Sequence, residues 1–339
     1  MELEPVATVD YHTGGEPFRI VPEPPVGLPG DSVADRRVRA MADQAVQELR
    51  RVLCYEPRGH ADMYGGFIVP PEDSGAHLGV LFWHKDGFST ACGHGTIALG
   101  VWAVDTRIVE APESGTVDVV VDVPSGRVVA RVSREDGHAS AVAFVNVPSF
   151  VLAQQVAVPT SRGEVRVDVS FGGAIYAQLP ASAVGLSVAP EHAGELIAIG
   201  REIKSALNGT EHAQHPTDPR LSGIYGTILF DDLGDDADGR VHQRNVTIFA
   251  DGQVDRSPCG SGTAARVASL AAEGRLAPDG TLVHDSIVGS TFTASIEEHV
   301  TVDGRRAVVP VVSGMAYRTG EHRFSVDPHD DLVPGFVLR

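Results

Sequence analysis

Short apolar runs of β-strand length recur along the chain, and breaks rich in Gly and Pro separate them. Helical spacing of apolar positions predicts one amphipathic helix over 35–52, with Val38, Met41, Ala45, Leu49 and Val52 on its buried face. The first half of the chain is therefore expected to be mixed α/β. Its predicted strands are 6–10, 18–21, 67–69, 78–83, 117–123, 127–132 and 141–147, and a second, buried helix is predicted over 96–104.

The second half of the chain repeats this order of elements. Each half has a double glycine, then a strand, a helix and a cysteine that opens an apolar helix; 78 residues separate Gly14 from Cys92, and 87 separate Gly172 from Cys259. We therefore predict two pseudo-symmetric α/β domains, 1–150 and 151–323, with a seam near 148–156 and a C-terminal strand, 324–339, that returns to the first domain. The predicted elements of the second half are strands 165–170, 174–179, 225–230, 245–249, 289–296 and 307–312, and helices 191–207 and 263–272.

The composition is that of a globular protein with a strong negative charge. Hydrophobic residues make up 42% and charged residues 21%, and 45 acidic against 27 basic residues give a net charge of −18. This excess argues against binding to nucleic acids or membrane surfaces. No apolar run reaches the roughly 18 residues of a transmembrane helix, and the acidic start, Met1–Pro5, is unlike a signal peptide. With only 3 cysteines, the protein is expected to be cytoplasmic; its oligomeric state, a homodimer included, is left open.

Two of the cysteines share a sequence context. Cys92 precedes Gly93-His94-Gly95 and Cys259 precedes Gly260-Ser261-Gly262, in each case at the predicted start of a helix. The first N–H groups of a helix lack partners within the helix and carry partial positive charge. We expect this charge to lower the thiol pKa from about 8.5 toward neutrality, and the glycines to let N–H groups approach a carboxylate. Two such helix starts facing each other would hold one carboxylate between two sulfurs.

Two thiols beside one carboxylate suit proton transfer at the adjacent carbon. Inverting that carbon requires a base on one face and an acid on the other, and two thiols can exchange these roles. The chain has only two lysines, Lys85 and Lys204, and the sequence around neither is typical of a pyridoxal site. We therefore expect chemistry on a small molecule without an organic cofactor.

Other interpretations of the same residues stay open. Buried cysteines are often ordinary core residues, which we expect for Cys54. Cys92 and His94 could form a nucleophilic pair of the hydrolase kind, and with Cys259 they could bind zinc, although no further ligand pair supports a metal. Asp255 could simply cap the turn that follows it. A protein that binds an amino acid without converting it is a further alternative.

Four ordered motifs resemble those of the proline racemase family: HTGGEP at 12–17, EPRGH at 56–60, CGHGT at 92–96 and DRSPCG at 255–260. The resemblance runs from about Val6 to the C-terminus. It implies a fold like that of diaminopimelate epimerase, with strands around a central helix in each of two domains and the active site at the domain interface. It also implies catalysis without a metal or an organic cofactor.

The resemblance implies a role for each matching residue. Cys92 and Cys259 take the positions of the catalytic thiols. Asp255 and His94 match groups that hold the ring nitrogen, and the helix starts match those that bind the carboxylate. The implied substrate-binding residues are Gly93, His94, Asp255, Gly260, Ser261, Tyr64 and Phe249.

The family includes proline racemases, 4-hydroxyproline 2-epimerases and trans-3-hydroxyproline dehydratases. Both thiol positions are cysteine here, as in the racemases and epimerases, whereas the dehydratases characteristically replace one. Other segments, such as 63–65 and 172–177, resemble the dehydratase branch, and the Tyr64 hydroxyl indicates a hydroxylated substrate. Because chemistry is set at the site, we predict a racemase or 2-epimerase of proline or hydroxyproline, with trans-3-hydroxy-L-proline dehydratase as the alternative.

Overall fold

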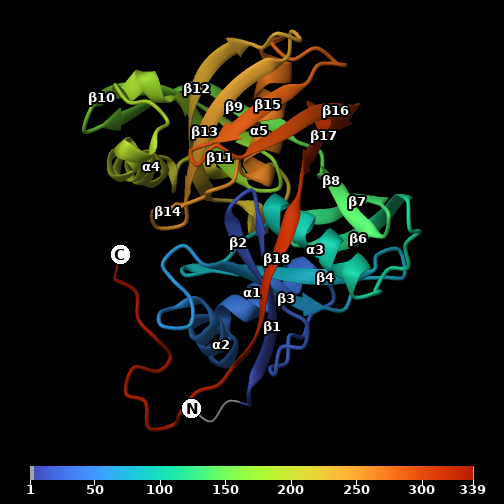
Figure 1. Ribbon diagram of the computed structural model, residues 1–339. Helices are drawn as coiled ribbons and strands as arrows, with labels where there is room; N and C mark the ends of the chain where they lie inside the picture. Colours follow the sequence, from blue (N-terminus) through green and yellow to red (C-terminus); the bar gives the residue numbers. More distant parts are fainter. Residues whose placement is uncertain (1–3, 339) are drawn as a thin grey trace. The chain divides into compact units, whose positions relative to one another are not determined.

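The computed structural model describes residues 4–338, which form two compact units (Figure 1). Among the described residues, the first unit comprises 4–90, 95–142 and 315–338, and the second comprises 91–94 and 143–314. The short segment 91–94, which carries Cys92, therefore groups with the half of the chain that carries Cys259. The domain limits expected from the sequence repeat stay a prediction.

The first unit is built on one mixed sheet. Its strands lie in the order β18–β1–β2–β3–β4–β6–β7, and neighbours are antiparallel except for the parallel pairs β2/β3 and β4/β6. β18 is the strand of the C-terminal region, and it pairs with β1 from end to end; no strand lies in 325–338. The strands are β1 Val6–Thr13, β2 Glu16–Val21, β3 Tyr64–Val69, β4 Leu78–His84, β5 Gly87–Phe88, β6 Gly115–Val123, β7 Gly126–Glu135, β8 His138–Val145, which crosses the limit of the unit, and β18 Ala316–Phe324.

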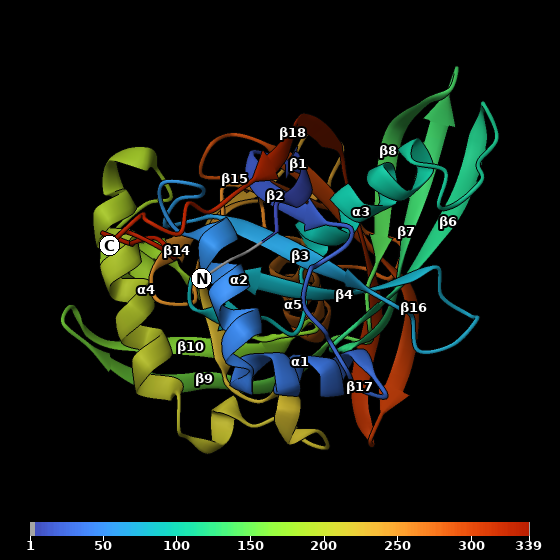
Figure 2. The same cartoon turned by 90° about the horizontal axis from the view of Figure 1, so that it is seen from below.

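The single helix predicted over 35–52 is wrong, because the chain breaks at Asp43. α1 (Val33–Ala42) and α2 (Gln44–Cys54) follow one another beside β4 (Figure 2). Asp43 has an extended backbone, and its carboxylate accepts a hydrogen bond from the Val46 N–H at 3.1 Å, so it caps α2. The turn of the chain leaves Val38 44% and Met41 49% exposed, which the helical pattern placed on the buried face.

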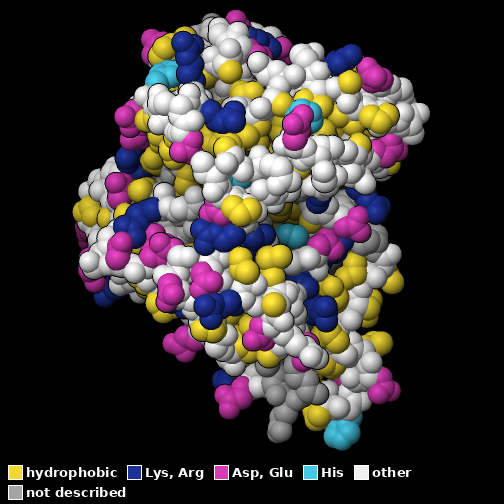
Figure 3. Space-filling view, turned by 180° about the vertical axis from the view of Figure 1, so that it is seen from behind, with side chains coloured by type: hydrophobic (Ala, Val, Ile, Leu, Met, Phe, Trp, Pro, Cys, Tyr) yellow, Lys and Arg dark blue, Asp and Glu magenta, His cyan; other side chains and the backbone are white. Residues whose placement is uncertain are grey.

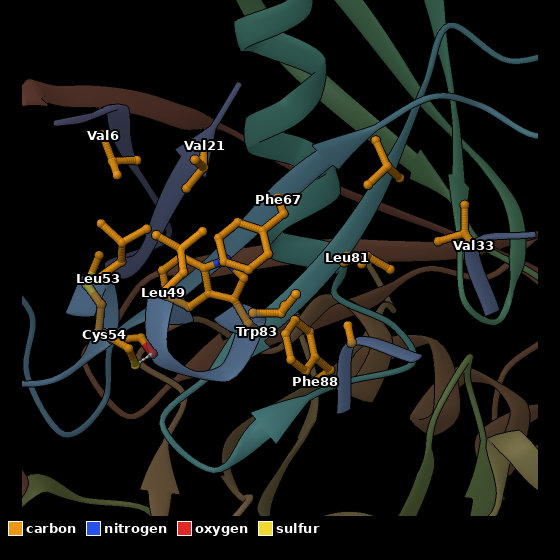
Figure 4. Close-up of a cluster of buried hydrophobic side chains, with 14 residues drawn as sticks. Val6, Val21, Val33, Leu49, Leu53, Cys54, Phe67, Leu81, Trp83 and Phe88 are labelled. Atoms are coloured by element: carbon orange, nitrogen blue, oxygen red, sulfur yellow. Dashed lines mark hydrogen bonds between the residues drawn. The ribbon is translucent and has the colours of Figure 1, made fainter. Parts of the chain in front are cut away.

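The inner face of α2 covers a hydrophobic core cluster of the first unit. Leu49 and Leu53 pack there with Trp83 of β4 and Phe67 of β3 (Figure 4). The expectation that Cys54 is a core residue is confirmed, since its side chain is fully buried and its Sγ lies 3.4 Å from the Met63 carbonyl oxygen. Burial raises the pKa of the Cys54 thiol to about 12.

α3 (Gly93–Asp105) is the central helix of the first unit. Its residues after the first turn are buried on all sides as far as Val104, which agrees with the absence of a polar face in its sequence. Gly100 allows β7 and β8 to approach, because a Cβ there would lie 2.7 Å from that of Ala130.

The second unit repeats the pattern of strands around one helix. Its strands lie in the order β9–β10–β11–β12–β13–β15–β16–β17, and α5 packs against β9, β10, β11, β16 and β17. α4 lies on β12 and β13 instead. The elements are β9 Phe150–Thr160, β10 Gly163–Phe171, β11 Ile175–Pro180, α4 Ala193–Leu207, β12 Ile224–Asp235, β13 Val241–Phe249, β14 Gln253–Val254, α5 Gly260–Ala272, β15 Leu282–Ser286, β16 Thr291–Val302 and β17 Arg305–Gly314.

The strands and helices predicted for this half are confirmed in kind, but the predicted set misses β9, β15 and the two-residue strand β14. The seam predicted near 148–156 is largely the start of β9, a strand that pairs with β10. Figure 3 shows acidic side chains interspersed with Arg and Lys on the face that it draws. Within residues 4–338, no helix is both long and apolar enough to cross a membrane.

Candidate active site

Cys259 lies at the N-terminal end of α5 in an unusual backbone conformation. Its φ of +65° falls in the left-handed region, which costs a residue with a Cβ about 1–3 kcal/mol and is concentrated at functional sites. Two hydrogen bonds hold it there: its N–H donates to Ser257 Oγ at 3.0 Å, and its carbonyl accepts from the Thr263 N–H at 2.7 Å. The side chain is almost completely buried, with 6% exposure.

The turn before Cys259 is fixed by buried polar groups. Thr263 Oγ1 donates to the Pro258 carbonyl at 3.0 Å, so the contact of 2.8 Å between Thr263 Oγ1 and His284 Nδ1 requires the histidine to donate. Burial lowers the pKa of His284 to about 3, so the ring is neutral. Asn245 Nδ2 also donates to the Pro258 carbonyl, at 3.1 Å.

Asp255 belongs to the same turn and is buried. Its Oδ1 accepts hydrogen bonds from the Ser257 N–H at 2.8 Å and from the Ser257 hydroxyl at 2.7 Å. Asp255 therefore does cap the turn, and through Ser257 it supports the backbone of Cys259. This structural role leaves room for a second one, because a carboxylate has two oxygens.

Cys92 precedes the first residue of α3 and is also buried. Its Sγ lies 3.5 Å from both ring nitrogens of His94. A sulfur equidistant from the two nitrogens lies off the lone-pair axis of either one. This geometry does not support the alternative of a Cys–His nucleophilic pair, which needs one aligned hydrogen bond.

The two helix starts that follow the cysteines are in backbone contact. A Cβ on Gly93 would lie 2.5 Å from Gly260 Cα and 2.8 Å from the Ser261 nitrogen. A Cβ on Gly260 would lie 2.6 Å from Gly93 Cα and 3.0 Å from the His94 nitrogen. Only glycine fits at either position. The structure thus brings together Cys92-Gly93-His94 and Cys259-Gly260-Ser261.

The expected lowering of the thiol pKa is wrong for Cys259. Burial raises its pKa well above the usual value, and the negative charge of Asp255 adds to this. The Gly262 N–H and the Thr247 hydroxyl act in the opposite direction, as the helix-start argument expects, but more weakly. In the structure as it stands, Cys259 is therefore a protonated thiol.

Two of the implied substrate-binding residues, Phe249 and Tyr64, lie in different units. Phe249 of β13 stacks on Tyr225, with ring centroids 5.7 Å apart. Tyr64 belongs to the first unit, where it is buried beside Phe18 and shares a hydrogen bond with the Ser89 hydroxyl. A substrate-binding role for Tyr64 stays a prediction.

Sequence reasoning missed Tyr176. This residue of β11 is fully buried, and its hydroxyl lies 2.7 Å from Ser261 Oγ and 3.9 Å from Cys259 Sγ. The double glycine Gly172-Gly173 just before it was the available signal. Gly172 approaches α5 so closely that a Cβ there would lie 2.4 Å from the Ser261 carbonyl oxygen. Among residues 4–338, no three His, Cys, Asp or Glu side chains are grouped so as to hold a metal ion.

Fold and site together define an α/β protein in which two central helices each begin at a buried cysteine followed by glycine. The chain belongs to the proline racemase family, since the family model described as "Proline racemase" matches residues 8–337. The resemblance carried by the four motifs is therefore confirmed.

Individual relatives extend over the whole chain. A 3-hydroxyproline 2-epimerase of Burkholderia multivorans is 43% identical over 98% of each chain. A trans-3-hydroxy-L-proline dehydratase of Bacillus thuringiensis subsp. konkukian is 41% identical over 98% of this chain and 97% of its own. The solved structure of a hydroxyproline epimerase from Agrobacterium vitis, with bound trans-4-hydroxy-L-proline, has a TM-score of 0.91 at 32% identity and covers 100% of this chain and 97% of that one. This similarity confirms the predicted α/β fold class.

Proposed function

We propose that this protein is a 2-epimerase that inverts the α-carbon of a hydroxyproline, and that 3-hydroxyproline is its substrate. The observation that carries the proposal is the backbone contact between Gly93 and Gly260, which joins two helix starts that each follow a cysteine. The two relatives named for 3-hydroxyproline support the choice of substrate.

In the proposed reaction the two thiols act on opposite faces of the α-carbon. For one epimer, the Cys92 thiolate takes the α-proton and the Cys259 thiol gives its proton to the other face; the reverse reaction exchanges the roles. The N–H groups of His94 and Ser261 bind the substrate carboxylate and stabilise the charge that develops as the proton leaves. Asp255 Oδ1 is engaged by Ser257, so Oδ2 is the proposed partner of the ring nitrogen, together with His94.

The alternative, dehydration of trans-3-hydroxy-L-proline, is favoured by the relatives that carry that name. In that reaction the α-proton and the β-hydroxyl leave as water, and the resulting enamine becomes a cyclic imine. It needs a base on one face only, so it gives no role to the second cysteine. The presence of both Cys92 and Cys259 therefore favours epimerisation.

The test incubates the protein with trans-3-hydroxy-L-proline and follows the products by NMR. An epimerase yields cis-3-hydroxy-D-proline, whereas a dehydratase yields the imine, which borohydride reduces to proline. Cys259→Ser is expected to abolish epimerisation, and Cys54→Ala, the matched control in the first unit, is expected to retain it. Substrate binding without any change at the α-carbon would instead identify a binding protein.

We further propose that the reaction needs neither a metal nor an organic cofactor and takes place in the cytoplasm. The assignment to the proline racemase family supports the first point, and the scarcity of cysteine supports the second. Full activity after exhaustive dialysis against a chelator is expected, and loss of activity that zinc restores would contradict it.

A further inference from the structure

The Tyr176 hydroxyl lies within reach of both Cys259 and Ser261. Its Oη lies 2.7 Å from Ser261 Oγ, a full hydrogen bond, and 3.9 Å from Cys259 Sγ, a long contact to sulfur. The Tyr176 ring is fixed by its neighbours, because Tyr225 packs against it edge to face with centroids 5.8 Å apart. Rotation of the O–H bond therefore decides whether Tyr176 donates to Ser261 or to Cys259.

The Tyr176 hydroxyl has a single proton to donate. Burial raises its pKa well above the usual value, so the phenol stays protonated throughout the working range of pH. It can donate either to Ser261 or to Cys259 at any one time. In the proposed reaction Cys259 alternates between a thiol, which is a weak hydrogen-bond acceptor, and a thiolate, which is a strong one. The Ser261 hydroxyl is therefore the better acceptor at one stage and the Cys259 sulfur at the other.

We propose that Tyr176 is a positioning residue whose hydroxyl donates to Ser261 while Cys259 is a thiol and turns to Cys259 Sγ when that sulfur becomes a thiolate. No proton leaves Tyr176; only the direction of its O–H bond changes. The inference rests on the proposed function in that it takes Cys259 as one of the two reacting thiols. It gives the enzyme a way to stabilise a buried thiolate that is otherwise costly.

Several other groups act on the charge of Cys259 and must be considered with Tyr176. Asp255 opposes the thiolate, while the Gly262 N–H and the Thr247 hydroxyl favour it. The Gly262 N–H is fixed in the backbone and the Asp255 carboxylate only accepts, so neither can turn from another acceptor to the thiolate as the Tyr176 hydroxyl can. The titratable side chains that the structure shows beside Cys259 are Asp255 from the preceding turn, Tyr176 from β11 and Tyr225 from β12. The helix start that carries Cys92 and His94 contacts Gly260 through its backbone.

The test measures the ionisation of Cys259 directly, without turnover. In a Cys92→Ser background, the rate of alkylation of Cys259 by iodoacetamide is followed against pH, with the modified peptide quantified by mass spectrometry. Tyr176→Phe keeps the ring and removes the donor to the thiolate. We expect the pH profile to move up by about one unit or more, so that alkylation at a given pH below the pKa slows about tenfold.

A second variant predicts a shift of the opposite sign. Ser261→Ala removes the competing acceptor, so Tyr176 can donate only to Cys259, and the profile is expected to move to lower pH. When Ser261→Ala is combined with Tyr176→Phe, it is expected to cause no further shift of the profile, because the Tyr176 hydroxyl that would donate to Cys259 is absent. Tyr317→Phe, on an exposed tyrosine of β18, is the control and leaves the profile unchanged.

Two results would overturn the proposal: a Tyr176→Phe profile that coincides with that of the parent, or a Ser261→Ala profile that stays in place or moves up. If Tyr176→Phe does not fold, the direction in which the Ser261→Ala profile moves is sufficient to test the proposal. The alkylation assay involves no turnover, so a negative result there refutes the role of Tyr176 and leaves the proposed function untouched. The proposed function is tested separately, by the activity of Cys259→Ser.

Discussion

Replacing Gly93 by alanine tests whether the close contact of the two helix starts is needed for activity. The added Cβ would lie 2.5 Å from Gly260 Cα and 2.7 Å from the Gly260 carbonyl carbon. Carbon atoms in contact prefer a separation of about 3.5 Å or more, so the two backbones must move apart by about 1 Å. Both partners are backbone atoms at the ends of buried helices, so no flexible side chain can give way.

The consequence for catalysis should exceed the consequence for stability. Overpacking of this kind costs about 1–3 kcal/mol of folding free energy, which the chain tolerates with a lowered Tm. A misplacement of about 1 Å at a reacting centre costs about 100-fold in rate. We therefore expect Gly93→Ala to fold and to lose about 100-fold or more in kcat/KM for epimerisation.

The matched control is Gly194→Ala in α4. Gly194 has no heavy atom within 4 Å of the position of an added Cβ, other than its chain neighbours and its own helix backbone. Alanine there is expected to raise stability by a few tenths of a kcal/mol to about 1 kcal/mol and to leave activity unchanged. Calorimetry and an NMR epimerisation assay measure both quantities. A Gly93→Ala protein with the kcat/KM and Tm of the wild type would refute the reasoning.

Three further predictions follow from burial, charge and capping. Because burial and Asp255 raise the pKa of Cys259, its alkylation rate should still climb about tenfold per pH unit beyond the usual thiol pKa of about 8.5, and a plateau below that pH would contradict the assignment. Cys54, with its pKa raised to about 12, stays protonated in the folded chain but ionises on unfolding above about pH 8.5. Its contribution to stability is therefore fully present below that pH and is lost above it, by about 1.4 kcal/mol per pH unit. Denaturant titrations of the wild type and of Cys54→Ala measure this loss. Above about pH 8.5 the wild type should lose about 1.4 kcal/mol of unfolding free energy per pH unit relative to the variant. A stability difference that does not depend on pH would contradict the raised pKa of Cys54. Asp43→Ala removes the cap of α2 and should cost about 1 kcal/mol in denaturant unfolding at unchanged activity; an unchanged midpoint would exclude the capping role.

The sequence identifies the parts of the site that depend on local patterns. A cysteine followed by glycine before an apolar run predicts a helix start near each cysteine, and both are confirmed, although the helices begin at Gly93 and Gly260, three residues before the predicted ranges. The break at Asp43 is also a local feature, but the apolar residues keep helical spacing on both sides of it, so the pattern predicts one continuous helix. The exposure of Val38 and Met41 therefore could not be read from periodicity alone.

The missed features depend on contacts between distant segments. Tyr176 reaches Ser261 only because β11 packs beside α5, 85 residues further along the chain. The pKa of Cys259 also depends on distant segments. The helix start favours the thiolate as expected, but burial by the surrounding structure has a larger effect and raises the pKa. Local sequence reports the first effect and not the second.

The most direct test of the two-thiol account is a single-turnover reaction in D2O that starts from trans-3-hydroxy-L-proline with protium at the α-carbon. If Cys92 and Cys259 act from opposite faces, deuterium enters the epimerised product while the remaining substrate keeps its protium. Deuterium appearing in unreacted substrate as fast as in product would mean that one group serves both faces, and would contradict the account.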